Sequence, residues 1–463
     1  MATLPPDPLA DGIARFAERL RRRETTSEAV TQSYLARIRA LEPRLKAFEY
    51  LDETWTLAQA KAIDALLAAG TDLGPLMGVP VAIKDLIAVD KTPAHAGSNL
   101  DVRNIIGAEG TFAKRLKALG CVVLGKTKTV EFAIGGTGIS GSRGCPWNPW
   151  DANVHRIPGG SSSGSAVAMA SGLCGFAIGS DTGGSVRTPA AFCGTFGLKT
   201  TKGRWPTDGV FPLSRTLDTL GLLTRSADDA AVILAAYEGI APIGAAPARG
   251  IRLGRPKNYF FDEIEGDVRR SVDAGIERLV KAGVAVDEIE VPGAAEIGPR
   301  FRAFVAAELV AELGGAEGFA KSRSQIDPVI AKRTETGVPL MADHYVTLMR
   351  EHMALQKKAR GWMDGFDGWV CPTVPYVAKP VTDYDDPASE GTISYAVART
   401  NRLVNLLGQC AVALPVQQLS GARLPTSLQI ICRGGEDTAA LAIGRTVESI
   451  VGAPPAPDLR GFL

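Results

Sequence analysis

The feature that most constrains the fold is an alternation of short apolar runs with helical patterns from about residue 75 onward. The runs VAIKDLIAV (81–89), CVVLGKT (121–127) and CGFAIGS (174–180) have the length and composition of buried strands, and TFAKRLKALG (111–120) has helical spacing. Further along, IRLGRP and VAVDEIEV are predicted strands on either side of the helix DVRRSVDAGIERLVKAG. Strands that alternate with helices are typical of an α/β architecture with a layered sheet.

The remaining segments fit one large domain over residues 1–463. Residues 8–70 are predicted to be helical, with a capping box at Thr25 and Glu28. The buried face of this helix is expected to carry Val30, Tyr34, Leu35, Ile38 and Leu41. Residues 296–362 are predicted to be mostly helical, and 363–463 to mix strands and helices. The best linker candidate, GIAPIGAAPARG, is short, so we expect a variable, partly helical insertion at about 240–360 within the same domain.

Composition excludes several classes of protein. The chain has 463 residues, 45% of them hydrophobic, and a formal net charge of +1, so no global field favours nucleic acid or acidic membranes. Seven cysteines without a C-x-x-C pair argue against a disulfide framework or a thiolate zinc site, and no metal or cofactor is expected. The polar first residues and the short, interrupted run LVNLLGQCAVALPV predict no signal peptide or membrane span, and hence a cytoplasmic protein.

The most unusual segment is rich in glycine and serine. Eleven of the 45 residues from 159 to 203 are glycine, whereas about 7% is the average. Such a stretch forms either tight turns between buried elements or a loop whose backbone N–H groups face an anion or a developing oxyanion.

Several catalytic templates fail in this block. GSSSG at 160–164 matches the nucleophile elbow and would make Ser162 the nucleophile, but no strand precedes it. Of the four histidines, His344 and His352 lie in polar, helix-like sequence and are expected at the surface. A P-loop is absent, and the kinase-like tetrapeptide V-A-I-K lacks the glycine loop, H-R-D and D-F-G that kinases require.

The remaining catalytic template is a serine nucleophile activated by a lysine base. Lys84 ends the apolar run Val81-Ala82-Ile83, and it can act as a base only if burial lowers its pKa from about 10.4. Asp85 would raise that pKa, unless strand alternation points it to the opposite face.

Five segments carry a family resemblance. They are GPLMGVPVAIKD, LGKTKTVEFAIGG, NPWDANVHRIPGGSSSGSAVAMASG, GSDTGGSVRTPAAFCGTFGLKTTKGR and LSRTLDTLGLLTRSADDAA, within residues 74–231. The later CPTVP and LPTSLQIICRGGED are also similar. The chain resembles the amidase signature family, which implies a central mixed β-sheet surrounded by helices, with 74–231 as the signature core. The match is weakest at about 240–360.

The resemblance implies a Ser-cisSer-Lys triad. Its nucleophile corresponds to Ser185, its middle serine to Ser161 and its base to Lys84. It also implies an oxyanion hole of backbone N–H groups, each donor contributing about 3 kcal/mol. The residues concerned are Thr182, Gly183, Gly184 and Ser185. Supporting positions map to Asp181, Arg187 and Ser162, and the segment GGTGIS suggests a substrate pocket at Gly136 and Thr137.

Other residues in these segments have simpler interpretations. The hydroxyls of Ser162, Ser163 and Ser165 are expected to cap a helix N-terminus. Trp205 and Phe211 are expected to pack in the core, as is Cys193.

The implied function is hydrolysis of a small-molecule amide to the acid and ammonia or an amine through an acyl-enzyme. The alternative is the glutaminase subunit of a tRNA-dependent amidotransferase, which predicts an obligate partner. A non-catalytic binding protein is disfavoured because Lys84, Ser161 and Ser185 are all present. A homodimer is a further expectation, and the chain alone does not specify the amide.

Overall fold

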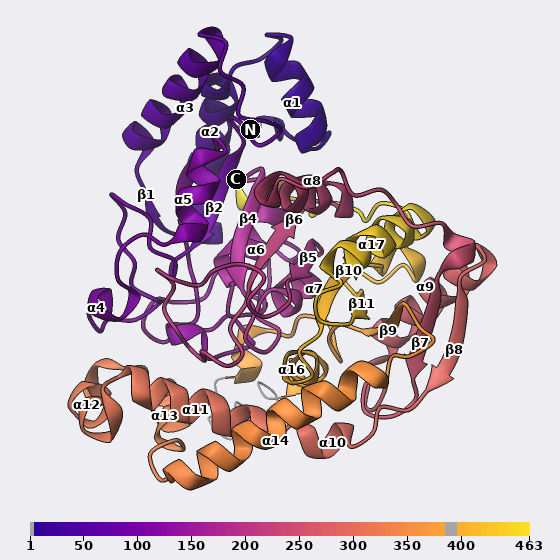
Figure 1. The fold of residues 1–463 in the computed structure, drawn as a ribbon. Coiled ribbons are helices and arrows are strands. Elements are labelled where there is room, and N and C mark those ends of the chain that lie inside the picture. The colour runs from indigo at the N-terminus through magenta and orange to yellow at the C-terminus, as the bar shows by residue number, and fades with distance from the viewer. Residues whose placement is uncertain (1–3, 385–395) are drawn as a thin grey trace.

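The computed structural model describes residues 4–384 and 396–463, and its strands form one mixed sheet (Figure 1). The order across the sheet is β1-β3-β2-β4-β6-β5-β10-β11-β9-β7-β8. Their bounds are β1 Phe48–Leu51, β2 Pro80–Lys84, β3 Val122–Thr127, β4 Phe176–Ser180, β5 Phe196–Lys199, β6 Leu220–Thr224, β7 Arg252–Pro256, β8 Ala285–Ile289, β9 Gly368–Pro372, β10 Cys410–Pro415 and β11 Ser427–Cys432. The predicted α/β architecture is confirmed.

The centre of the sheet explains where polar side chains can gather. Strand β2 pairs in parallel with both β3 and β4, and all three strands are buried along their whole length. The carboxyl ends of parallel strands meet at one edge, which is where α/β folds place their ligands. Lys84 is the last residue of β2 and Ser180 the last of β4, so their side chains lie at this edge.

Helices cover the sheet (Figure 1). The N-terminal group is α1 Ile13–Arg21, α2 Ser27–Leu45, α3 Glu53–Ala68, α4 Arg103–Ile106 and α5 Thr111–Ala118. The sheet is further covered by α6 Ser163–Ala170, α7 Arg187–Cys193, α8 Ala227–Glu238, α9 Gly266–Lys281 and α17 Asp437–Val451. A separate layer along the lower edge of Figure 1 contains α10 Ala294–Ile297, α11 Arg300–Glu312, α12 Gly315–Ser322, α13 Pro328–Glu335 and α14 Ala342–Gly361, with α16 Arg399–Leu406 above it.

The N-terminal segment differs from the prediction in two details. The expected buried face of α2 is confirmed, but the N-cap is Thr26, whose hydroxyl accepts from the Ala29 amide at 3.0 Å, and Thr25 lies outside the cap. The chain then leaves α2 at Lys46 in a left-handed conformation and adds β1 antiparallel to β3. This edge strand was missed because its four residues are too short to show alternation.

Residues 240–360 combine sheet and helix. The predicted strands are present as β7 and β8, which pair with each other at one end of the sheet. Helix α9 connects them in the sequence. The predicted helices of 296–362 are confirmed as α11 to α14. Strands β5 and β6 were not predicted, because each is only four or five residues long and contains a glycine, which weakens the strand pattern.

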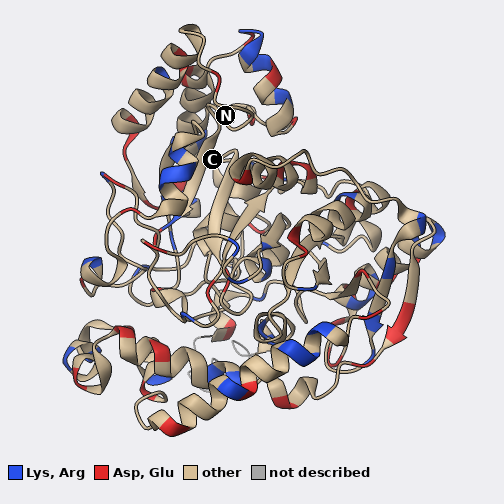
Figure 2. Ribbon diagram, viewed as in Figure 1, with Lys and Arg blue, Asp and Glu red and all other residues tan. Residues whose placement is uncertain are grey.

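Charged residues of both signs alternate on the outer helices, as α14 illustrates (Figure 2), in keeping with the balanced net charge. Across the two described ranges, no helix is both long and apolar enough to cross a membrane.

Candidate active site

Lys84 lies fully buried at the end of β2. Its Nζ atom donates to Ser161 Oγ at 2.6 Å and to Ser180 Oγ at 2.9 Å. Burial lowers the pKa of Lys84 to about 7, against the opposing charges of Asp181 and Asp218. The amine is therefore neutral in a large fraction of molecules near neutral pH, which is the condition for a lysine to accept a proton.

Asp85 faces a different partner. Its Oδ1 atom lies 3.7 Å from Nζ of Lys126, and its Oδ2 atom accepts from the backbone amide of His95 at 3.2 Å. Lys126 stands on β3 opposite Ile83, so it reaches the face of the sheet that Asp85 occupies. Strand alternation thus separates the Asp85 carboxylate from Lys84, and Lys126 compensates its charge.

Ser161 is held in place by a tightly packed glycine segment. The peptide bond between Gly160 and Ser161 is cis. A Cβ atom on Gly160 would lie 2.7 Å from the backbone nitrogen of Gly138, so only glycine fits there. The next amide, that of Ser162, donates to the Ser185 carbonyl at 3.2 Å, which joins the two serine segments directly.

Ser185 follows β4 in the loop that leads into α7, and 8% of its surface is exposed. Gly184 before it has φ +116, and a Cβ atom there would lie 2.5 Å from Cβ of Asn401. Glycine is required at this position for both reasons. The structure therefore brings Lys84, Ser161 and Ser185 to one edge of the sheet.

The loop is braced by a buried Asp181–Arg187 ion pair at 3.0 Å. Asp181 accepts from the amides of Gly184 at 2.7 Å and Val186 at 3.1 Å. Burial alone would raise the pKa of Asp181, but the Arg187 guanidinium outweighs it and holds that pKa well below its usual range. Arg187 also donates to side-chain oxygens of Asn401, Asn405 and Gln429.

The amides of this loop divide into two groups. Gly184 was predicted as an oxyanion-hole donor, but its amide already donates to the Asp181 carboxylate. Within the described part of the chain, the amides of Thr182, Gly183 and Ser185 donate to no protein acceptor, and these three residues line a cavity. They are the N–H groups that remain for a ligand.

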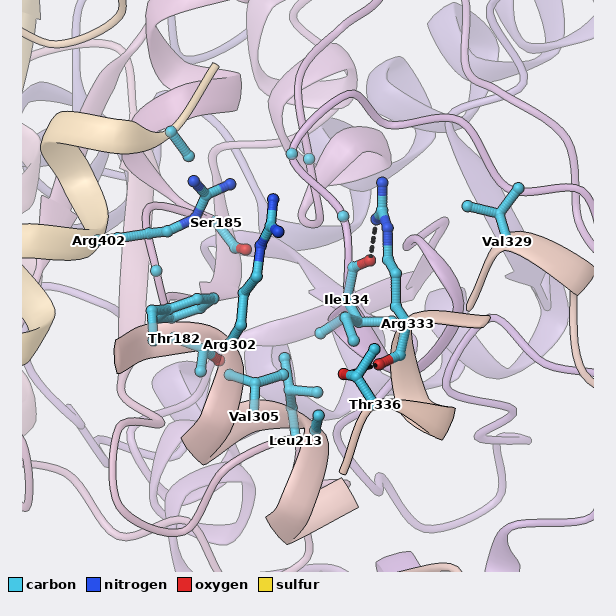
Figure 3. Close-up of a pocket in the computed structure, with 18 of the residues that line it drawn as sticks. Ile134, Thr182, Ser185, Leu213, Arg302, Val305, Val329, Arg333, Thr336 and Arg402 are labelled. Carbon is cyan, nitrogen blue, oxygen red and sulfur yellow. Dashed lines mark hydrogen bonds between the residues drawn. The ribbon is translucent and has the colours of Figure 1, made fainter. Parts of the chain in front are cut away.

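The cavity has a volume of about 490 Å³ (Figure 3). Its walls combine the Ser185 loop with the segment 133–136, Gly160 and helices α11, α13 and α16. Gly136 lines it as predicted, but Thr137 does not. The Thr137 hydroxyl accepts from the Ile139 amide at 3.3 Å and its carbonyl from the Gly159 amide at 3.0 Å, so it supports the glycine segment.

Comparisons with known proteins place the chain in a family. A family model described as Amidase matches residues 29–441. The chain belongs to the amidase signature family. It is 37% identical to 2-amino-5-chloromuconic acid deaminase of Comamonas testosteroni, covering 96% of this chain and 98% of that protein. It is 31% identical to one subunit of the Glutamyl-tRNA(Gln) amidotransferase of Geobacter metallireducens, covering 92% of this chain and 94% of that subunit.

A comparison with a solved structure supports the same family assignment. The native peptide amidase of Stenotrophomonas maltophilia superposes with a TM-score of 0.84 at 26% identity, over 98% of this chain and 100% of that one. The amidase signature fold is thereby confirmed, and the protein is an amidohydrolase that acts on C–N bonds.

Some predicted roles of the amidase residues are wrong. None of the three serine hydroxyls caps α6. The Ser162 hydroxyl accepts from the Ser180 amide. Ser165 donates to the Ile178 carbonyl at 3.0 Å, and Ser163 donates to the Lys128 carbonyl at 3.4 Å. These bonds connect the start of the helix to β4 and to the residue that follows β3. His352 is buried and packs 4.9 Å from the Phe304 ring, because α14 turns it toward α11; His344 is exposed as predicted.

The core predictions hold. Trp205 packs 5.2 Å from the Phe112 ring, and Phe211 stacks 5.0 Å from the Phe132 ring. Cys193 is fully buried.

Several site residues of this amidase were missed. Ser180 contacts Lys84 directly, and its position next to Asp181 in GSDTGGS was the available signal. Asp218 accepts from the Thr182 hydroxyl at 2.6 Å, and burial raises its pKa to about 6. The four-residue spacing of Asn401 and Asn405, typical of one helix face, marked the partners of Arg187.

Proposed function

We propose that this amidase hydrolyses a small-molecule carboxylic amide through an acyl-enzyme on Ser185, with Ser161 as proton bridge and Lys84 as general base. The observation that carries the proposal is the 2.6 Å contact between Lys84 Nζ and Ser161 Oγ in a fully buried environment. Ser185 lines the cavity, and its carbonyl accepts from the amide of Ser162, the residue after Ser161.

The first half of the reaction acylates the enzyme. Ser185 Oγ attacks the amide carbonyl carbon while its proton passes to Ser161 and the Ser161 proton passes to neutral Lys84. The amides of Thr182, Gly183 and Ser185 stabilise the resulting oxyanion. The C–N bond then breaks as the leaving nitrogen takes the proton back from the Lys84 ammonium through Ser161, and ammonia or an amine departs.

The second half restores the enzyme. Water attacks the Ser185 ester and gives a proton to Lys84 by the same route. The C–O bond to Ser185 breaks, Ser185 regains its proton, and the carboxylic acid leaves. No cofactor takes part in these steps.

The testing experiment is the Ser185→Ala variant. We expect it to lose turnover by at least about 10³-fold and to form no covalent adduct in mass spectra of enzyme quenched with a slow amide. Ser163→Ala, a control from the same serine cluster, should keep both. Turnover of Ser185→Ala within tenfold of wild type would contradict the nucleophile assignment.

The similarity to a component of Glutamyl-tRNA(Gln) amidotransferase favours a second candidate, release of ammonia from glutamine for a partner protein. The purified chain separates the two functions. Hydrolysis of simple amides without any partner supports the first function, whereas glutaminase activity that appears only with added partner proteins supports the second. A cytoplasmic location and a homodimer remain part of the first proposal.

A further inference from the structure

The charge of the cavity wall points to the substrate. Four cationic side chains line the cavity, and within residues 4–384 and 396–463 no acidic side chain joins them. They are Arg302, Lys332, Arg333 and Arg402. The rest of the wall is largely apolar, with Leu213, Val305 and Val329 among its members. A concave site with one sign of charge attracts ligands of the opposite sign.

We infer that the substrate is an amide with an apolar carbon skeleton and a carboxylate group, and that Arg402 determines this specificity. The inference rests on the proposed function, since it assumes that the scissile carbonyl lies at Ser185.

Arg402 is the cation best placed for this role. It lies on α16 and is 7% exposed. Its Cγ atom is 3.1 Å from the position that a Cβ atom on Gly183 would take, and its guanidinium carbon lies 5.5 Å from the centre of the Phe301 ring. Gly183 belongs to the loop whose amides face the cavity. The side chain of Arg402 therefore packs directly against the loop that would hold the substrate carbonyl.

Burial distinguishes Arg402 from the other three cations. Arg333 is half-buried and donates to the carbonyl of Ile134 at 2.8 Å (Figure 3). Arg302 and Lys332 are exposed, so water and salt screen their charge. All three add to the positive field of the cavity, and Arg402 is the most buried of the four.

The chemistry of arginine favours a carboxylate. Its planar guanidinium donates two parallel N–H bonds to the two oxygens of a carboxylate. Such charge-assisted bonds are shorter and stronger than those to a neutral group. A substrate with a methyl group in place of the carboxylate forgoes them.

The activity test compares two amides of similar length, glutaramate and the neutral hexanamide. We expect wild-type kcat/KM to be at least about tenfold higher for glutaramate, because bonds to charged groups contribute that much or more. Arg402→Gln should lower the glutaramate-to-hexanamide ratio of kcat/KM about 10- to 100-fold, mostly through KM, and Arg402→Lys should lower it less. Arg215→Gln, at a 70% exposed arginine paired with Glu312 on α11, is the matched control and should leave the ratio unchanged.

A binding test removes the dependence on turnover. Glutarate is titrated calorimetrically into Ser185→Ala and into Ser185→Ala/Arg402→Gln. Binding that weakens at least tenfold in the double variant supports the inference. Equal affinity in the two variants, or glutarate binding no tighter than 1,5-pentanediol, overturns it.

The two proposals fail in different ways. A wild type that hydrolyses hexanamide as well as glutaramate overturns the carboxylate specificity and leaves the amidase mechanism intact. A wild type that hydrolyses neither amide, while Ser185→Ala binds glutarate through Arg402, contradicts the mechanism and supports the carboxylate site.

Discussion

Nζ of Lys126 lies 3.7 Å from Oδ1 of Asp85, and both side chains are completely buried. Asp85 follows Lys84 in the chain, so its charge would reach the general base if Lys126 did not compensate it. We expect Lys126→Met to raise the pKa of Lys84 and move the acid limb of the kcat/KM profile to higher pH.

That variant also leaves a buried carboxylate without its cation, so its free energy of unfolding should fall by about 3–5 kcal/mol. The control is Lys126→Met/Asp85→Asn, which removes both charges and should return the pH profile toward that of wild type. An unchanged profile in the single variant, measured where circular dichroism shows it to be folded, would contradict the compensation.

The pH dependence of the wild type follows from Lys84. Burial places the pKa of this amine at about 7, and only the neutral form accepts a proton. Below about pH 7 kcat/KM should therefore fall about tenfold per pH unit, and above it the rate should level off. Stopped initial rates from pH 5 to 9 check this, and a profile that stays flat to pH 5 would exclude Lys84 as the base.

The same pKa affects stability. The unfolded chain keeps Lys84 protonated up to about pH 10.4, whereas the folded chain releases the proton near 7. The unfolded state binds the extra proton between these values, so the contribution of Lys84 makes the fold more stable as pH rises through that window. Urea titrations of wild type and Lys84→Met at pH 6.5 and 9 should show a larger rise for the wild type.

Ser161 is proposed to pass protons between two groups. Ser161→Ala removes the hydroxyl that lies 2.6 Å from Lys84, so kcat should fall about 10²- to 10⁴-fold, the range of general acid–base catalysis. KM for a good amide should change little. Ser165→Ala, which removes a structural hydroxyl of the same cluster, is the comparison. Equal kcat values for the two variants would show that Ser161 carries no protons.

The Asp181–Arg187 pair is expected to stabilise the whole fold as well as the loop. Asp181→Asn leaves Arg187 without its buried counterion and should lower the free energy of unfolding by about 3–5 kcal/mol. The matched control is Asp458→Asn, at an exposed carboxylate 2.6 Å from Arg460, where no measurable change is expected because water screens the pair. Equal urea midpoints for the two variants would contradict the prediction.

Local patterns predicted much of the fold. The strands around Lys84 and Ser180 and the helices of 296–362 were evident from apolar spacing, since spacing directly reflects which face is buried. Strands β5 and β6 were not, because each run is only four or five residues long and is interrupted by a glycine. Thr25 was predicted as the N-cap of α2 in place of Thr26, because both residue types are the same and only the backbone geometry distinguishes the two positions.

Long-range relationships were beyond such patterns. Lys84, Ser161 and Ser185 were predicted from family motifs, and the fold brings them to one edge. That Lys126 accompanies Asp85, or that Arg402 packs on Gly183, depends on register and on helix placement across more than 200 residues of chain. His352 shows the converse, since a polar neighbourhood in sequence conceals a buried position in space.

Much of the cavity wall comes from a later stretch of the chain than the reacting groups. Lys84, Ser161 and Ser185 belong to the first part, whereas α11, α13 and α16 come from residues 300–406. Mutations in the later stretch can reshape the chamber without displacing the proton path. An evolving lineage can thus acquire a new substrate by exchanging these helices. A laboratory chimera that takes α11, α13 and α16 from a relative should have the substrate preference of the donor and the chemistry of the recipient.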